Sequence, residues 1–242
     1  MSSMYVVVAY FIGLVDLIVG LICVFRASRL KPNTYLGFRV PSVFLTQKIW
    51  SKINVLSGIL GSINFVIIVI LSLFVQSIYL MVYAVLSIML MVSALSIYSR
   101  RIIEFETGRE KGGEYPIEVL PTIKIRVSII LFGWAIMSVL IVLIFMSRSQ
   151  LPEILAVHFS AEGRPDVFMH RDEFIVSFVS IALGGMILIT SLLYSIKDVP
   201  SLKEFESYNK SLVSILQLVL VCIPLLLVYV YLVIYLSLIH IS

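Results

Sequence analysis

Long uninterrupted runs of hydrophobic residues alternate with shorter polar segments along this chain of 242 residues. Each run is about 20 residues long, which is the length that an α-helix needs to cross a bilayer. The runs are continuous and do not alternate between apolar and polar positions, so the pattern favours helices over a barrel. We therefore predict an all-α, polytopic bundle of six transmembrane helices, over residues 4–25, 53–75, 78–98, 125–146, 174–194 and 211–235.

The composition agrees with an integral membrane protein. Hydrophobic residues make up 60% of the chain and charged residues only 13%, whereas soluble domains carry roughly 25% charged residues. The two cysteines, Cys23 and Cys222, lie inside apolar runs without the spacing of a metal site, so we expect no disulfide and no metal. The net charge of +4 reflects where the basic residues fall, and we do not expect nucleic-acid binding.

The basic residues are sorted between the two sides of the predicted bundle. Three connections, which follow the first, third and fifth runs, hold fifteen of the eighteen Lys and Arg residues. The positive-inside rule places these connections in the cytoplasm, so both termini are expected outside the cell. The fifteen residues are Arg26, Arg29, Lys31, Arg39, Lys48, Lys52, Arg100, Arg101, Arg109, Lys111, Lys124, Arg126, Lys197, Lys203 and Lys210.

This topology divides the chain into two membrane regions joined by a cytoplasmic loop. Residues 1–98 form the first region, residues 99–124 the loop, and residues 125–235 the second region. Residues 236–242 read LSLIHIS, which is the translation of the end of a common transposon-based sequencing adapter. We expect this heptapeptide to be an adapter artefact, in which case the true C-terminus is missing; the alternative is a natural short tail.

Asp16, Asn54 and Asn64 are candidate polar sites inside the apolar runs. Asp16 is midway along the first run, where a carboxylate costs several kcal/mol unless it is paired, solvated or protonated. Its candidate partners are Asn54 and Asn64, which share one small-residue face of the second run. Two interpretations are open: a proton or cation site, and a structural hydrogen bond between helices.

The connection after the first run has a specific pattern. Gly37 permits a tight turn, Pro41 ends any preceding helix, and a helical pattern begins after Thr46. Trp50 fits an anchor at the membrane interface, and Arg39 could bind a lipid phosphate or pair with a carboxylate. This segment resembles the signature of the SdpI family, on the residues Asn33, Gly37, Arg39, Pro41, Trp50, Asn54 and Gly58.

The connection after the fourth run is unusually polar and reads LPEILAVHFSAEGRPD over residues 151–166. We predict an outward-facing cap, because two prolines stop the flanking helices and Gly163 supplies a turn. The stretch resembles the small domain that accompanies SdpI, although Ala156 and Val167 replace its usual proline and glycine and the two motifs are in swapped order. The matching residues are Leu151, Pro152, His158, Phe159, Gly163, Pro165 and Asp166.

A metal site in this stretch is the competing interpretation. His158, Glu162, Asp166 and His170 recur every four residues and would share one face of a helix. Gly163 and Pro165 interrupt such a helix, so a structured polar loop is the stronger interpretation.

The resemblance implies a role in immunity. SdpI-like proteins are membrane proteins that protect a cell from its own secreted peptide toxin, and SdpI also holds a transcriptional repressor at the membrane. We therefore expect a multi-pass cell-membrane protein whose partners are the bilayer, an extracellular peptide toxin and a cytosolic regulator. The residues expected to bind a peptide or partner are His158, Phe159, Gly163, Asp166, Asn33, Gly37, Arg39 and Trp50.

Catalysis, transport and a structural role are the alternatives to immunity. The chain contains none of the H-E-x-x-H, G-x-S-x-G or phosphate-loop motifs, so we predict that it is not an enzyme and uses no cofactor. A transporter of ions or small solutes is the first alternative, and it requires a wet path that contains Asp16. A structural subunit of a membrane complex is the second alternative.

Overall fold

A computed structural model describes residues 2–33, 35–44, 46–109, 124–160, 164–197 and 206–239. All six predicted helices are present, and each is long and apolar enough to cross a membrane. The all-α transmembrane bundle is therefore confirmed. The helices are α1 (Ser2–Phe25), α2 (Gln47–Leu71), α3 (Ser77–Arg109), α4 (Val127–Ser147), α5 (Arg171–Ile196) and α6 (Glu206–Ile239).

The helix limits follow local chemistry. Helix α2 begins at Gln47, ahead of the predicted membrane run at residue 53, and this confirms the helical pattern predicted after Thr46. The Thr46 hydroxyl accepts a hydrogen bond from the Ile49 N–H and caps the helix. The α2–α3 connection is short, as predicted. Residues 110–123 of the predicted cytoplasmic loop and residues 240–242 lie outside the described residues.

The remaining elements are short and lie between the helices. Among the described residues they are three 3-10 turns, η1 (Ala27–Arg29), η2 (Pro41–Phe44) and η3 (Arg148–Gln150), and two strands, β1 (Ile154–Phe159) and β2 (Pro165–His170). The strands form an antiparallel two-stranded sheet, so the predicted outward cap is a β-hairpin.

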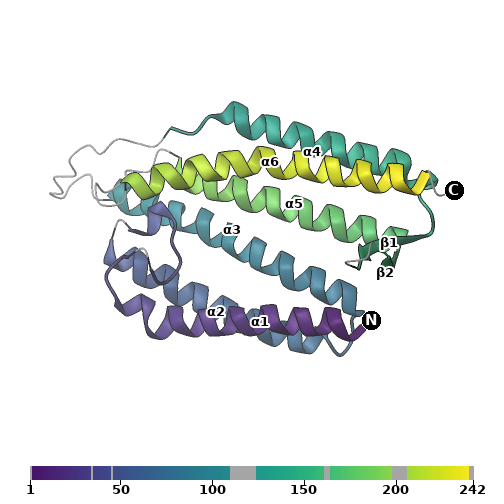
Figure 1. The fold of residues 1–242 in the computed structure, drawn as a ribbon. Coiled ribbons are helices and arrows are strands. Elements are labelled where there is room, and N and C mark those ends of the chain that lie inside the picture. The colour runs from purple at the N-terminus through teal and green to yellow at the C-terminus, as the bar shows by residue number, and fades with distance from the viewer. Residues whose placement is uncertain are drawn as a thin grey trace.

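The helices form two groups of three (Figure 1). Helices α1, α2 and α3 pack together, as do α4, α5 and α6, and the main junction between the groups is between α3 and α5. Gly184 of α5 lies against α3 there, because a Cβ atom at this position would be 2.6 Å from the side chain of Leu86. Arg100 of α3 lies over the ring of Tyr194 on α5, with its guanidinium carbon 4.2 Å from the ring centroid.

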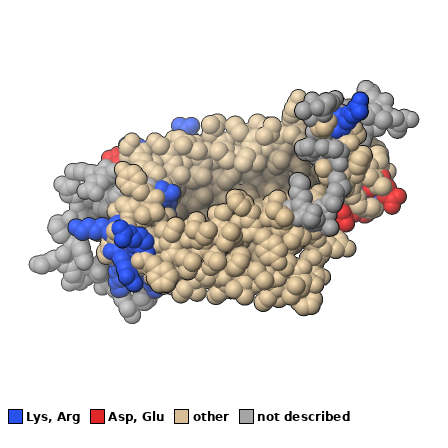
Figure 2. Space-filling view, turned by 60° about the horizontal axis from the view of Figure 1, so that its bottom comes forward, with Lys and Arg blue, Asp and Glu red and all other residues tan. Residues whose placement is uncertain are grey.

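The two ends of the bundle carry different structures (Figure 1). Both ends of the chain and the β-hairpin lie at one end, which we call the hairpin end. The α1–α2 connection lies at the opposite end, which we call the basic end because Lys and Arg side chains gather there (Figure 2). The chain therefore alternates between the ends as the sequence predicted, while the side of the membrane that each end faces stays a prediction.

The closest helix pairing in the first group is between α1 and α2. A Cβ atom at Gly58 would lie 2.3 Å from the carbonyl oxygen of Gly20, so the two backbones are in direct contact. The residues of α1 on this face recur at alternating spacings of four and three, the repeat that keeps one stripe facing a partner helix. We call this stripe and its partner face the α1–α2 seam; on α1 it comprises Ala9, Gly13, Asp16, Gly20 and Cys23.

The second group has its own close contact, between α4 and α6. Pro224 lies inside α6 and has no N–H, so it cannot donate to the carbonyl of Leu220 one turn earlier. Gly133 of α4 lies against that carbonyl oxygen, and a Cβ atom there would be only 2.7 Å away from it. The backbone of α4 thus covers the carbonyl that the proline leaves without a helical donor.

Replacement of Gly58 by Ala should destabilise the protein, because the new methyl group would overlap the Gly20 carbonyl. We expect a loss of about 1–3 kcal/mol in the free energy of unfolding, as for other overpacked sites. Gly185→Ala is the matched control, since no atom lies within 4 Å of a Cβ atom at that position. Unfolding of both purified variants in detergent, followed by circular dichroism, tests this; equal stability would contradict a close α1–α2 contact.

Candidate functional site

The connection between α1 and α2 is anchored by Trp50 in the first turn of α2. The Trp50 indole N–H donates to the carbonyl of Ala27 over 2.7 Å, and its ring stacks on Phe44 with centroids 5.7 Å apart. The prediction that Trp50 is a membrane-interface anchor is wrong, because its side chain has no exposed surface and lies inside the protein. It holds the connection to the bundle instead.

A second anchor joins the middle of the connection to α2. The Asn54 side-chain oxygen accepts from the Phe38 N–H over 2.7 Å, and its amide donates to the Trp50 carbonyl over 2.9 Å. Gly37 has a φ of 97°, a conformation that favours glycine, and a Cβ atom there would lie 2.3 Å from the Asn54 oxygen. Only glycine therefore lets the chain pass this close to α2.

The first part of the connection is shaped by Asn33. Its side-chain oxygen accepts from the N–H groups of Tyr35 and Leu36 over 3.0 and 2.9 Å, which closes a tight turn. Asn33, Gly37 and Trp50 thus shape the segment, whereas the side chain of Arg39 is exposed on it. We call residues 27–44 the clamp segment.

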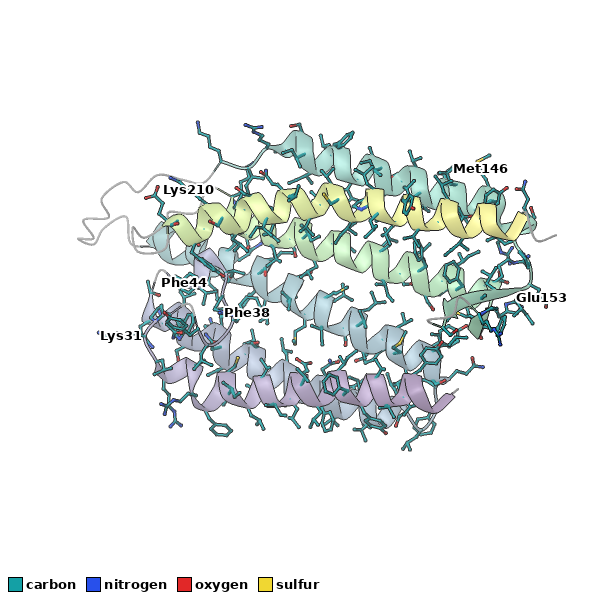
Figure 3. All side chains as sticks on the ribbon, viewed as in Figure 1. Lys31, Phe38, Phe44, Met146, Glu153 and Lys210 are labelled. Atoms are coloured by element: carbon teal, nitrogen blue, oxygen red, sulfur yellow. The ribbon has the colours of Figure 1, made fainter. Side chains whose placement is uncertain are left out.

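The clamp segment also touches the second group of helices. Phe44 meets Tyr208 of α6 edge to face, with ring centroids 6.0 Å apart. Leu192 of α5 packs against the same buried cluster, which is built from Val40, Val43, Phe44, Ile49, Trp50, Ile53 and Ile102. Figure 3 shows Phe38 and Phe44 where this segment meets the bundle. At the basic end, therefore, the predicted motif links both halves of the molecule.

Asp16 has one of its two predicted partners. Its carboxylate accepts from the Asn64 amide over 2.9 Å, and the hydroxyl of Tyr83 on α3 donates to the Asn64 oxygen over 3.2 Å. Asn54 is instead engaged by the clamp segment. Asp16 and Asn64 are only 9% and 7% exposed, so this chain of hydrogen bonds is buried among three helices.

The β-hairpin presents one face to the bundle and the other outward. Leu155 is fully buried and pairs with Met169, while Ile154 and Phe168 on the opposite face are 63% and 51% exposed. This alternation is expected for a sheet with one covered face. In the described part of the chain the sheet has only two strands, so each strand has an edge next to no other strand.

The predicted residues of the polar stretch fall on the hairpin. His158 and Phe159 belong to β1 and Asp166 belongs to β2, although the structure does not describe their side chains. Gly163 lies outside the described residues. The helical face that would bring His158 and His170 together does not form, because both residues are in strands. No cluster of three potential metal ligands occurs among the described residues.

The base of the hairpin is tied to the helices that flank it. Arg148, just after α4, contacts both carboxylate oxygens of Asp172 over 3.0 and 2.9 Å. Arg171 donates to the Leu151 carbonyl over 3.1 Å. Glu153 is at this end of the molecule, as Figure 3 shows, 3.4 Å from the His170 ring. These contacts hold the base of the hairpin in place against the two flanking helices.

No protein-family model, curated protein or solved structure matches this chain. The class that the fold defines is a multi-pass membrane protein with six helices capable of spanning a bilayer.

Two features of the site were missed in the sequence. The small-residue stripe of α1 was not recognised, although its spacings of three and four resemble those of the face on α2 and indicate how closely the two helices pack. Tyr83 carried no such signal, because one tyrosine among many apolar residues of α3 does not reveal that it reaches Asn64. The prediction that Asp16 has an asparagine partner on the second helix is confirmed for Asn64.

Loss of the Asn54 side chain should open the clamp segment. Cys23 is 2% exposed and lies in contact with Ser57 and the backbone of Phe38, so it is covered by the chain that Asn54 holds. In a Cys222→Ser background, Asn54→Ala should raise the rate at which a maleimide labels Cys23 by roughly tenfold, since about 1–3 kcal/mol of buried hydrogen bonding is lost. Gln47→Ala, which removes a hydrogen bond to the Leu30 carbonyl at the rim of the connection, is the control. An unchanged rate in the Asn54 variant would contradict this role.

Proposed function

We propose that this protein protects a cell from a membrane-active peptide, or senses such a peptide, and that the peptide binds the β-hairpin. The observation that carries the proposal is the exposed two-stranded sheet at one end of a transmembrane bundle. The resemblance to the SdpI family supports the same role. Under the positive-inside rule the hairpin end faces the outside of the cell, where a secreted peptide would arrive.

Both the backbone and the side chains of the hairpin can bind an extended peptide. A strand edge presents N–H and C=O groups to which a further strand can bind, a common mode of peptide recognition. The outward face adds exposed apolar contacts through Ile154 and Phe168. Because Arg148 and Arg171 fix the base of the sheet, binding need not first order the hairpin.

A route from the hairpin to the basic end supports a sensing role. Helix α5 begins at Arg171, directly after β2, and its Leu192 packs against the buried cluster of the clamp segment. A shift of α5 on peptide binding would therefore reach the segment that carries Arg39. We propose that this segment meets a cytosolic regulator and that the protein has no catalytic role.

The proposal predicts that protection depends on the outward face of the hairpin. Cells that express the wild-type chain should survive a challenge with the secreted membrane-active peptide, and Phe168→Ser should lower the tolerated dose several-fold. Phe74→Ser is the matched control, because Phe74 is an even more exposed aromatic residue, at 80%, in the short α2–α3 connection at the same end. Survival is compared at equal amounts of protein in the membrane. Protection that is equal in all three forms would contradict binding at the hairpin.

Transport of a proton or cation is a second candidate, favoured by the chain of hydrogen bonds from Asp16 through Asn64 to Tyr83. It predicts ion flux in proteoliposomes that Asp16→Asn abolishes, because an amide cannot carry the same charge. Asn64→Ala serves as a comparison that leaves the carboxylate in place. If the protein is folded and shows no flux above that of empty vesicles, this candidate fails and the carboxylate is left with a structural role.

A further inference from the structure

A strongly basic surface lies at the corner between α1 and α2. Residues 26–52 contain six Lys and Arg residues and no Asp or Glu. Arg26, Arg29 and Lys31 are all exposed there, whereas the exposed Lys52 of α2 lies over the ring of Tyr98 on α3. Figure 2 shows the basic side chains at this end, with uncharged surface along most of the bundle, and Figure 3 shows Lys31 at the outer edge.

Exposed apolar side chains accompany these charges. Tyr35 is 85% exposed, Phe25 61% and Leu36 37%. Phe25 ends a helix that is apolar enough to cross the membrane, so the corner lies at the level where the hydrocarbon core gives way to headgroups. Cations beside aromatic and aliphatic groups at this level suit a surface that is apolar below and anionic above.

The corner is held in shape, unlike a flexible basic tail. Asn33 closes the turn that carries Tyr35 and Leu36, and the Gln47 amide donates to the Leu30 carbonyl over 2.9 Å. The Trp50 indole fixes the chain at Ala27, between Arg26 and Arg29. The positions of the cations are therefore set by the fold before any ligand arrives.

We propose that this corner, comprising Arg26, Arg29, Lys31, Tyr35 and Leu36, is a binding surface for the headgroups of acidic phospholipids. The guanidinium groups would bind the lipid phosphate through paired hydrogen bonds, while Tyr35 and Leu36 contact the upper part of the acyl chains. Residues 26–52 themselves contribute no carboxylate that would compete with the phosphate. This inference is independent of the proposed role in immunity.

The test measures lipid binding to the purified full-length chain in a neutral detergent. Native mass spectrometry would count bound phosphatidylglycerol and phosphatidylcholine over a range of lipid concentrations. We expect phosphatidylglycerol to bind more tightly and the double variant Arg29→Gln, Lys31→Gln to lose about tenfold or more in affinity, since each cation near an anionic lipid surface contributes about fivefold. The control double variant Lys124→Gln, Arg126→Gln removes the same charge from exposed residues that precede α4 and should bind as the wild type does.

Two further measurements test the contribution of the acyl chains and of the arginine side chain. Tyr35→Ser should weaken phosphatidylglycerol binding without any change of charge, and Arg29→Lys should retain only part of it, because the charge stays while the paired hydrogen bonds are lost. Inorganic phosphate at the same concentration should not displace the lipid, because it lacks acyl chains. Equal binding of the two lipids, equal loss in both double variants, or displacement by inorganic phosphate would each overturn the proposal. Circular dichroism of every variant checks that the chain is folded.

Discussion

The first half of the molecule depends on how closely α1 and α2 approach each other. Gly20 and Gly58 place the two backbones in contact, and this fixes the register at which every other pair along the seam meets. Asp16 then faces Asn64, and the end of α1 reaches the indole of Trp50. In lipid such packing replaces the hydrophobic effect that joins helices in water, so small residues carry the association. The buried carboxylate and the clamp segment both take their positions from this contact.

The transmembrane helices could be predicted almost completely from the sequence, because hydropathy over about 20 residues depends on local composition alone. The partner of Asp16 could be narrowed to Asn54 or Asn64 by depth and spacing. The role of Trp50 was misread, because a tryptophan beside lysines near a helix start looks the same whether it faces lipid or protein. The strands around His158 were missed as well, since strands of only six residues give a weak periodic signal.

The two polar motifs serve different purposes in the structure. In the first motif, the hydrogen bonds of Asn33 and Trp50 and the backbone conformation of Gly37 shape a segment that touches both helix groups. In the second motif, one face of the hairpin, which includes Leu155, is buried against the bundle, and the other face, which includes Phe168, is exposed. A motif that stabilises a fold and a motif that forms an exposed binding surface can thus have similar sequences, because both are rich in Gly, Pro and polar residues.

The order of the contacts along the chain has a consequence for biosynthesis. Helices α1 and α2 are consecutive, so their seam can close while the rest of the protein is still being translated. The face of α3 that meets α5 has no such neighbour, and α4 must be inserted before α5 appears. During that interval Leu86 and Met89, which later meet Gly184, would face lipid or an insertion factor. If translation stalls between α3 and α5, α1 and α2 can therefore already be packed together, while the face of α3 that later meets α5 is still without its partner helix.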